Sequence, residues 1–268
     1  MRSGVVSSSA CVSLLLLSRP LMAGPPPSWQ SLSPGLELGR FGDPPVTVVR
    51  VDPSRYEFRL LSAKTLGLKG APTAPGWVEG HGVAGVINAS MFRADHLTSV
   101  GYMRDGKGTN NPSWNKDNAV FVSQPLKPGL PPVRILDRTC EDAAGLARQY
   151  RVAAQNIRMI DCRRRNAWAQ QPRKWSTACV GTDEQGRVLL IHARAPYTTH
   201  DLIDVLLALP LGLERLMYVE GGPEASLHVK VGGKVVVSEM GSFETGFFES
   251  DTNRVFWPLP NVIAFAER

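Results

Sequence analysis

The chain has 268 residues and a mass of 29.2 kDa, and 43% of its residues are hydrophobic and 20% charged. This composition excludes a largely disordered protein, because the apolar surface is sufficient to offset the entropy lost when the chain is ordered. The formal net charge of +6 is a mild bias that does not by itself indicate nucleic-acid binding.

Residues 1–23 have the features of a secretory signal peptide. Arg2 supplies a positive end, residues 14–17 form the centre of a short apolar stretch, and Ala23 is a small residue suited to cleavage. A buried N-terminal helix is the alternative, but several serines and Pro20 interrupt any amphipathic face. We therefore expect a secreted or periplasmic protein. No later apolar stretch approaches the ~20 residues of a membrane-spanning helix, so we expect no integral membrane segment after signal removal.

The next residues predict a linker followed by strands. Residues 24–35 are rich in Pro, Ser and Gly, and we expect a linker over 24–40 and one catalytic domain over 41–268. Apolar runs typical of strands lie at 46–51, 56–61, 83–88, 99–103 and 119–122, and again at 133–136. The Pro-rich connection at 125–132 is either a domain boundary or a surface loop, and the loop is the simpler interpretation.

The second half predicts more strands and one clear helix. A short helix is expected at 141–150, and strands at 157–160, 177–182, 187–193, 216–220, 225–231, 234–238 and 262–266. Asp183-Glu184-Gln185-Gly186 has the turn chemistry of a hairpin. The clearest helix begins near Thr198, which is suited to cap it, and ends at Pro210. Because most strands are joined by short turns and one long helix crosses over, we predict an α+β fold, a mixed β-sheet with helices packed on it.

The cysteines and histidines favour no metal cofactor. Cys140, Cys162 and Cys179 are too widely spaced for a zinc site or a disulfide-rich scaffold, and no histidine pair has metal-ligand spacing. A divalent cation near Glu220 stays an open alternative. One disulfide fits an oxidising compartment, with Cys140 and Cys162 as the suggested pair, whereas Cys179 lies in an apolar run typical of a core residue.

Two segments carry residues suited to binding a sugar or an anion. The Glu220-Gly221-Gly222 turn follows an apolar strand, and its glycines leave backbone N–H groups accessible to an anion or a sugar hydroxyl. Asn88 ends another apolar strand, and its amide donates and accepts hydrogen bonds as sugar hydroxyls require. Taken singly, an ordinary Gly-Gly turn and a turn-forming Asn explain these residues as well.

A third segment carries positive charge. Arg194 shares a strand face with His192 and precedes the helix N-terminus at Thr198, an arrangement suited to a two-pronged contact with phosphate. An ordinary surface cation explains Arg194 equally well. Positive charge is also dense at Arg158, Arg163, Arg164, Arg165, Arg173 and Lys174. Such a run is usually a solvated face, although it also attracts anionic substrates.

In this order, the three segments resemble those of the phosphodiester glycosidase (uncovering-enzyme-like) family over residues 83–231. The family carries an Asn-Gly-Gly-Phe-Phe-like segment after a strand, here Asn88-Ala89-Ser90-Met91-Phe92, and later a strand that ends in Arg, here Arg194. After a helix comes a Leu-Asp-Gly-Gly-Gly-Ser-Ser-like turn, here Val219-Glu220-Gly221-Gly222-Pro223-Glu224-Ala225-Ser226. Glu220 replaces the usual Asp, and three of the motif glycines are replaced, which indicates a divergent subgroup.

The resemblance implies a hydrolase, a glycosidase that cleaves a sugar-1-phosphodiester. With the N-terminal signal, the charge and the cysteine and histidine spacing, we expect this hydrolase to be exported, with no cofactor and no nucleic-acid partner. It implies Glu220 as a base or electrostatic stabiliser, Arg194 as a clamp on the phosphate and Asn88 as the group that orients sugar hydroxyls. The residues expected to help bind substrate are Gly221, Gly222, Arg173, Ser90, Thr198 and His200. Together, Asn88, Arg194 and Glu220 are expected to line one cleft.

Two other functions fit the same residues. One is a non-catalytic protein that binds cell-wall glycan or an anionic polymer. The other is a phosphodiesterase that cuts the phosphorus side of the bond. The sequence contains no G-x-S-x-G elbow, P-loop or dinucleotide fingerprint that would favour a different reaction.

Overall fold

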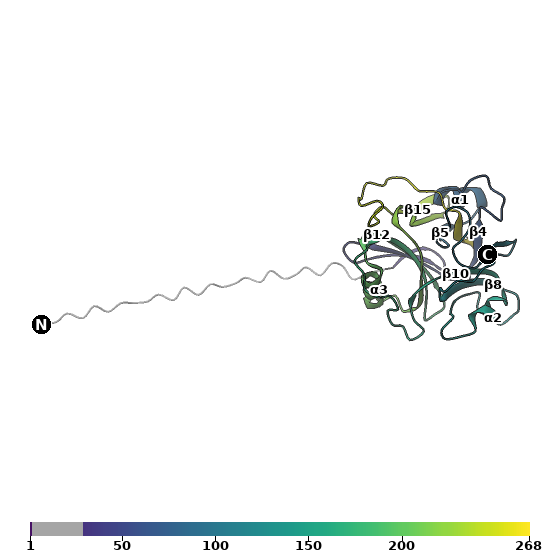
Figure 1. The fold of residues 1–268 in the computed structure, drawn as a ribbon, viewed down its shortest axis with the longest axis horizontal. Helices are drawn as coiled ribbons and strands as arrows, with labels where there is room; N and C mark the ends of the chain where they lie inside the picture. Colours follow the sequence, from purple (N-terminus) through teal and green to yellow (C-terminus); the bar gives the residue numbers. More distant parts are fainter. Residues whose placement is uncertain (2–28) are drawn as a thin grey trace.

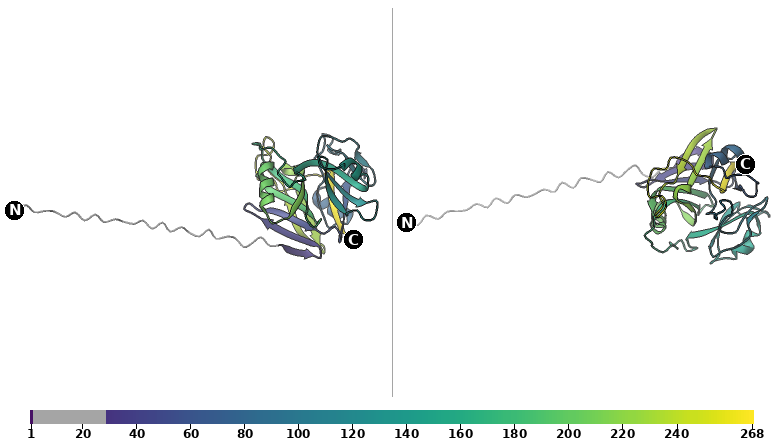
Figure 2. Two further views of the ribbon diagram at one scale, coloured as in Figure 1. Left: turned by 90° about the horizontal axis from the view of Figure 1, so that it is seen from below. Right: turned by 45° about the horizontal axis from the view of Figure 1, so that its top comes forward.

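The protein consists of two antiparallel β-sheets packed face to face (Figures 1 and 2). The computed structural model describes Met1 and residues 29–268. The larger sheet has 11 strands, nine of them in the order β1-β2-β3-β12-β11-β13-β10-β6-β7, with β8 pairing with β10 and β9 beside this path. The smaller sheet has five strands in the order β15-β14-β5-β16-β4. Apart from Met1, the expected signal peptide lies outside the described residues.

The larger sheet contains β1 (Gln30–Ser33), β2 (Leu36–Phe41), β3 (Val46–Val51), β6 (Met103–Asp105), β7 (Thr109–Asn111), β8 (Ala119–Pro125), β9 (Val133–Asp137), β10 (Tyr150–Ile160), β11 (Trp175–Asp183), β12 (Val188–Tyr197) and β13 (Leu213–Gly221). The smaller sheet contains β4 (Tyr56–Ser62), β5 (Gly85–Asn88), β14 (Ser226–Val231), β15 (Lys234–Met240) and β16 (Asn261–Glu267). The helices are α1 (Ala74–His81), α2 (Ala143–Ala147) and α3 (Thr199–Ala208), with a single 3-10 turn η1 (Gly222–Glu224).

The main hydrophobic core lies between the two sheets. Because side chains alternate along a strand, each sheet turns one apolar face towards the other. Val49 and Leu190 of the larger sheet belong to the same buried cluster as Ile87 of the smaller sheet. Phe58 of β4 meets Phe121 of β8 with their ring centroids 6.2 Å apart. The fold is therefore stabilised mainly by contacts of sheet on sheet.

The helices cover the outer faces of the sheets. Leu202, Ile203 and Leu206 of α3 pack on the larger sheet, whereas Trp77 and Val78 of α1 pack on the smaller one, so the two helices lie far apart (Figure 1). The predicted α+β class is wrong, because the described chain has 16 strands and only three short α-helices and is essentially all-β. The sequence identified α3, but it did not reveal that a second sheet, rather than helices, completes the core.

Several boundaries also differ from the sequence-based expectation. Strands β1 and β2 occupy much of the expected linker at 24–40 and pair onto the larger sheet through β3, so the folded part begins earlier than predicted. Helix α1 was not predicted. Its sequence contains Pro75, Gly76 and Gly80, all residues of low helix propensity, and it depends on the buried Trp77 for its packing.

The structure confirms the predicted helix cap, hairpin and loop, each of which depends on residues close together in the sequence. Thr198 caps α3, because the Asp201 N–H donates to its Oγ1 at 3.0 Å, and the helix ends at Ala208 before Pro210. The predicted hairpin joins β11 and β12, with Gly186 at a φ of +76°. The Pro-rich connection is the loop between the paired strands β8 and β9.

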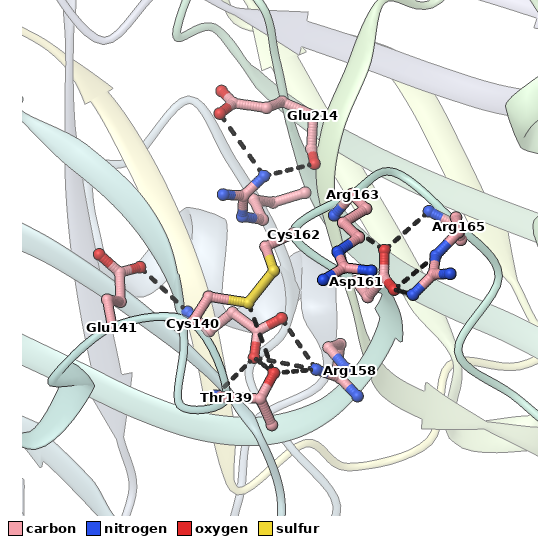
Figure 3. Close-up of a disulfide and its surroundings, with 11 residues drawn as sticks. Thr139, Cys140, Glu141, Arg158, Asp161, Cys162, Arg163, Arg165 and Glu214 are labelled. Carbon is pink, nitrogen blue, oxygen red and sulfur yellow. Dashed lines mark hydrogen bonds and ion pairs between the residues drawn. A yellow bond between two sulfur atoms is a disulfide. The ribbon is translucent and has the colours of Figure 1, made fainter.

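A disulfide joins Cys140 to Cys162 (Figure 3), which confirms the suggested pairing. It ties the segment after β9 to the start of the connection between β10 and β11. Cys179 is fully buried and free, and burial raises the pKa of its thiol. Asp137 lies near the disulfide as a potential metal ligand, but the bond occupies both sulfur atoms.

Several arginines near the end of β10 and in the connection after it form ion pairs. The Arg158 guanidinium donates to both carboxylate oxygens of Asp137 at 3.0 Å. Arg165 pairs with Asp161 at 2.8 Å, and Arg164 pairs with Glu184. These three arginines therefore help to fix the connection. Within the residues that the structure describes, no helix has the length and apolar character that a membrane crossing requires.

Candidate active site

The chain passes from the larger sheet to the smaller one at residues 221–226, here called the crossover. Strand β13 ends at Gly221, η1 follows, and β14 begins at Ser226. The crossover therefore contains the Gly-Gly turn noted in the sequence. Side chains from both sheets reach the crossover. They are Asn88 of β5, His192 of β12 and Glu244 of the long connection between β15 and β16.

Asn88 holds the crossover in place. Its side chain is buried, its Nδ2 donates to the Glu224 carbonyl at 3.0 Å, and its Oδ1 accepts from the Ser226 N–H at 2.7 Å. Both ends of the amide therefore bind the backbone of the crossover. The structure places Asn88 beside the Glu220 turn, as expected, in a position that shapes this turn.

Steric crowding favours glycine at position 221, and the backbone conformation favours it at position 222. A Cβ atom at Gly221 would collide with the Tyr218 hydroxyl and lie 2.8 Å from Cδ1 of Trp175. At Gly222 the φ angle is +67°, and a Cβ atom would lie 2.5 Å from Oε2 of Glu244. Such a φ angle strains residues that carry a side chain, so this is not an ordinary, replaceable Gly-Gly turn.

Three carboxyl groups gather around these glycines. Glu220 is 8% exposed, and one of its oxygens accepts the Gly221 N–H at 3.1 Å. Glu224 follows in η1. Its Oε2 is 3.4 Å from the point where a Gly222 Cβ would lie, and Glu244 approaches the same point more closely. Glu220, Glu224 and Glu244, here called the carboxyl cluster, thus come from two distant parts of the chain.

Burial sets the protonation of the carboxyl cluster. Burial raises the pKa of Glu220 from 4.5 to about 8. The hydrogen bond from the Gly221 N–H lowers this pKa, and the negative charges of Glu224 and Glu244 raise it further. Burial likewise raises the pKa of Glu224, with a further contribution from Glu244. At neutral pH Glu220 therefore retains its proton, a state that acid catalysts share.

Aromatic side chains and one arginine surround the carboxyl cluster. Trp175 and Tyr218 meet edge to face with ring centroids 6.3 Å apart, and burial raises the pKa of Tyr218 well above 10, so its hydroxyl stays protonated. Arg173 Nη2 lies 3.7 Å from Glu244 Oε1, and the Arg173 side chain is 58% exposed. Arg173 therefore supplies a positive charge beside the carboxyl cluster that remains accessible to a ligand.

Arg194 lies in a separate cavity of about 370 Å³, which His192 also lines. The Arg194 guanidinium donates to the carbonyls of Met240 at 2.7 Å and Asn253 at 2.9 Å, and pairs with Asp251 at 2.6 Å. Glu220 and Asn88 do not line this cavity. We expected Asn88, Arg194 and Glu220 to line one cleft. Asn88 and Glu220 lie together at the crossover, whereas Arg194 lies in a different cavity.

His192 supports the crossover from the same cavity. Its Nε2 lies 3.1 Å from the Ala225 carbonyl, which requires this nitrogen to carry the hydrogen. Burial lowers the pKa of His192 to about 4; Arg194 acts in the same direction, and Glu239 opposes it. The imidazole is therefore neutral at physiological pH.

The other expected binding residues have structural partners. The Ser90 hydroxyl lies 3.0 Å from the Met91 carbonyl and 2.9 Å from Ser99 Oγ, within hydrogen-bonding distance of both, and Thr198 caps α3. His200 Nδ1 lies 2.6 Å from the Trp168 carbonyl. The Trp168 ring packs on Tyr218 with the ring centroids 5.7 Å apart, so Trp168 connects the start of α3 to the site.

The sequence analysis did not identify Tyr218, Trp175 or Glu244 as site residues. Tyr218 lies two residues before Glu220, so strand periodicity could have drawn attention to it. Glu244 had no local signal, since it reaches the site through an isolated bridge to Trp175, far away in the sequence.

The fold and the site together define a two-sheet β protein whose carboxyl groups gather where the chain changes sheets. The model of the phosphodiester glycosidase family matches residues 81–266. The chain therefore belongs to the phosphodiester glycosidase family, as the sequence resemblance predicted. No curated protein matches the chain.

Two solved structures resemble this fold. The catalytic domain of zebrafish N-acetylglucosamine-1-phosphodiester alpha-N-acetylglucosaminidase, described as auto-inhibited by its pro-peptide, has a TM-score of 0.62 and 12% sequence identity, over 89% of this chain and 86% of that one. A hypothetical protein from Synechocystis has a TM-score of 0.60 and 15% identity, over 91% of this chain and 64% of that one. At these identities the likeness concerns the fold alone.

Proposed function

We propose that the chain is a hydrolase that cleaves the glycosidic bond of a sugar-1-phosphodiester. The observation that carries this proposal is the carboxyl cluster at the crossover, in which Glu220 retains a proton at neutral pH. Membership of the phosphodiester glycosidase family supports the reaction class. The zebrafish enzyme of similar fold is named for a substrate with this type of bond.

The reaction places different demands on the two sides of the bond. As the bond between the anomeric carbon and the phosphate oxygen breaks, positive charge develops on the sugar and negative charge on the phosphate. We assign Glu220 as the proton donor to the departing oxygen. Glu224, which is less buried, is assigned as the carboxylate that stabilises the sugar. The raised pKa thus favours an acid role for Glu220 over the base or stabiliser inferred from sequence.

Arg173, rather than Arg194, is assigned to the phosphate. Arg173 is exposed beside Glu244, whereas two backbone carbonyls and Asp251 already bind the Arg194 guanidinium. Asn88 is assigned as a positioning residue that holds the crossover, and Arg194 as one that holds the backbone at Met240 and Asn253. Gly221 and Gly222 allow the carboxyl cluster to approach the backbone closely.

Turnover of a defined substrate tests the proposal. Purified protein is incubated with sugar-1-phosphodiesters, and the released sugar is measured. Glu220→Gln is expected to lower kcat by at least about 10²-fold, the usual contribution of a general acid. Glu79→Gln, on the exposed side of α1, is the matched control with unchanged activity. Wild-type protein that binds such ligands without cleaving any of them would instead be a glycan- or polymer-binding protein.

Water labelled with heavy oxygen identifies the bond that is cut. Cleavage at the anomeric carbon places the label in the released sugar. Label in the phosphate product would assign the chain as a phosphodiesterase and contradict the glycosidase mechanism.

We also propose that the protein is exported. The Cys140–Cys162 disulfide supports this location, because such bonds persist mainly in oxidising compartments. Expression of the full chain, followed by N-terminal sequencing of the secreted or periplasmic protein, is expected to find a mature chain starting near Gly24. Retention of an uncut chain in the cytoplasm would contradict export.

A further inference from the structure

The connection between β15 and β16 begins with a loop at residues 241–253, here called the closed loop. Hydrogen bonds tie its two ends together. Asn253 Nδ2 donates to the Gly241 carbonyl at 2.7 Å, and the Ser242 hydroxyl donates to the Ser250 carbonyl at 2.8 Å. Loops whose ends lie close together are compact units that frequently carry functional groups.

The start of the closed loop lies directly on the crossover. The Gly241 N–H donates to the Ala225 carbonyl at 2.6 Å, and a Cβ atom at Gly241 would collide with the Gly222 carbonyl. Glycine therefore allows the two backbones to approach this closely. The closed loop is thus attached to the same turn around which the carboxyl cluster gathers.

A fully buried serine, Ser176 of β11, anchors the closed loop next to Glu244. Its Oγ accepts the N–H groups of Ser242 at 2.9 Å and Phe243 at 3.2 Å and donates to the Arg194 carbonyl at 2.6 Å. The Ser176 N–H also donates to the Phe243 carbonyl at 2.8 Å. A serine hydroxyl has one hydrogen and two lone pairs, so every hydrogen-bonding position of Ser176 Oγ is used.

The backbone of Glu244 is fixed from two sides. Within the closed loop, its N–H donates to the Phe248 carbonyl at 2.9 Å and its carbonyl accepts the Phe248 N–H at 3.0 Å. Towards β11, Glu244 forms an isolated bridge with Trp175. The next residue, Thr245, donates its N–H to the Lys174 carbonyl at 3.0 Å, and its Oγ1 accepts the Lys174 N–H at 3.0 Å.

The closed loop places two charged groups of the site. Glu244 Oε2 lies 2.5 Å from the point where a Cβ atom of Gly222 would lie. Arg173 Nη2 donates to the Thr245 carbonyl at 3.3 Å and lies 3.7 Å from Glu244 Oε1. The loop therefore holds a carboxyl group against the Gly-Gly turn and a guanidinium beside it.

We propose that the closed loop is a positioning element of the site and that Ser176 is its anchor. By holding Glu244 against Gly222, the loop keeps a like charge beside Glu220, and it holds Arg173 where the phosphate of the substrate would lie. This inference rests on the proposed function for its effect on turnover, whereas its effect on Glu220 is measured without a substrate.

The ionisation of Glu220 reports on the position of Glu244. Burial raises the pKa of Glu220 to about 8, and Glu224 from η1 and Glu244 from the closed loop raise it further. Tyr218 on the same strand stays protonated, because burial raises its pKa, and Arg173 lies on the far side of its ion pair with Glu244. Displacement of Glu244 is therefore expected to lower the pKa of Glu220.

A titration followed by NMR tests the anchor without requiring catalysis. The protein is labelled with carbon-13 at the glutamate carboxyl carbons, and Glu220→Gln identifies the Glu220 signal. Ser176→Ala is expected to lower the pKa of Glu220, because two consecutive N–H groups of the closed loop lose their acceptor. Thr245→Val, which removes the hydroxyl that accepts from Lys174, is expected to lower it by a smaller amount.

Ser123→Ala is the matched control. Ser123 is also fully buried, and its hydroxyl donates to the Phe58 carbonyl at 3.1 Å, outside the carboxyl cluster. Like Ser176→Ala, it is expected to lower the thermal unfolding midpoint, because a buried carbonyl loses its donor. Unlike Ser176→Ala, it is expected to leave the titration of Glu220 unchanged.

A double-mutant cycle shows whether Ser176 acts through Glu244. In a Glu244→Gln background, Ser176→Ala is expected to cause no further change in the pKa of Glu220. An equal fall of that pKa in both backgrounds overturns the proposal. An unchanged titration of Glu220 in folded Ser176→Ala also overturns it, and Thr245→Val decides the same question if Ser176→Ala does not fold.

Kinetics then separate this inference from the proposed function. With a cleaved substrate, Ser176→Ala is expected to lower kcat/KM by at least about tenfold, because displacement of a site group by about 1 Å costs up to ~10²-fold. Ser123→Ala is expected to stay within about twofold of wild type. A Glu220 pKa that depends on Ser176 in a protein without turnover would keep the positioning role and remove the hydrolase. Turnover with a Glu220 titration that is insensitive to Ser176→Ala would keep the hydrolase and remove the positioning role.

Discussion

The crossover is flanked by the carboxyl cluster and by the Arg194 cavity, and these two regions treat charge in opposite ways. In the carboxyl cluster, like-charged groups crowd around Gly222, and burial makes ionisation of Glu220 unfavourable. In the Arg194 cavity, Asp251 pairs with Arg194, Thr47 donates to Glu239 at 3.1 Å, and Arg40 lies 3.6 Å from Glu239. Crowded acidic groups with a raised pKa are typical of a reactive site, whereas fully paired charges are more often structural.

The largest expected difference between the regions is in turnover. We expect Glu224→Gln to lower kcat roughly 10³-fold, because the sugar loses its stabilising carboxylate in the transition state. Glu239→Gln is the matched change in the other region, and its kcat is expected to stay within about twofold of wild type. Measured rates of sugar release decide the comparison, and equal losses in the two variants would break it.

The second difference is in how stability depends on pH. Glu220 has a folded-state pKa of about 8, above its value of 4.5 in the unfolded chain. Its contribution is therefore fully present below pH 4.5 and is lost as the pH rises to about 8. Relative to wild type, Glu220→Gln is expected to gain stability across this window by a few kcal/mol, on the order of the shift.

Urea unfolding of wild type and Glu220→Gln at pH 5, 7 and 9 measures this gain. Glu79→Gln, an exposed substitution, should follow the wild-type curve. A stability difference between Glu220→Gln and wild type that stays constant with pH would show that Glu220 ionises normally, and it would remove the acid role.

A third prediction concerns Arg194. Arg194→Met leaves the carbonyls of Met240 and Asn253 without their donor, and we expect a loss of about 2 kcal/mol in the free energy of unfolding. The kcat/KM of the folded variant should change by less than about fivefold, because Arg194 lies outside the carboxyl cluster. A 10²-fold or greater loss of kcat/KM at unchanged stability would restore Arg194 as the phosphate clamp.

The smallest expected effect is at Thr47. Thr47→Val keeps the shape of the side chain and removes only its hydrogen bond to Glu239, so a loss of about 1 kcal/mol in stability is expected, with unchanged turnover. Thermal unfolding and sugar release measure the two quantities. Any change in KM beyond the error would show that the Arg194 cavity communicates with the substrate.

Features that act between close neighbours in the chain were predicted well from sequence. Thr198 caps α3 through a residue three positions away, and the β11–β12 hairpin follows from a four-residue turn. Most strands were predicted from short apolar runs. The fold class was missed because an apolar run shows that a strand is buried and does not show which sheet or helix covers it.

The sequence by itself determined most of the strand segments, the start of α3 and the order of motifs that identifies the family, and it only suggested the pairing of Cys140 with Cys162. Only the tertiary structure decided that Arg194 faces a different cavity from Glu220, that Glu244 completes the carboxyl cluster, and that Glu220 holds a proton. The physical reason is that strand pairing, desolvation and charge proximity depend on groups that meet in space, and their separation along the chain carries little information about that meeting.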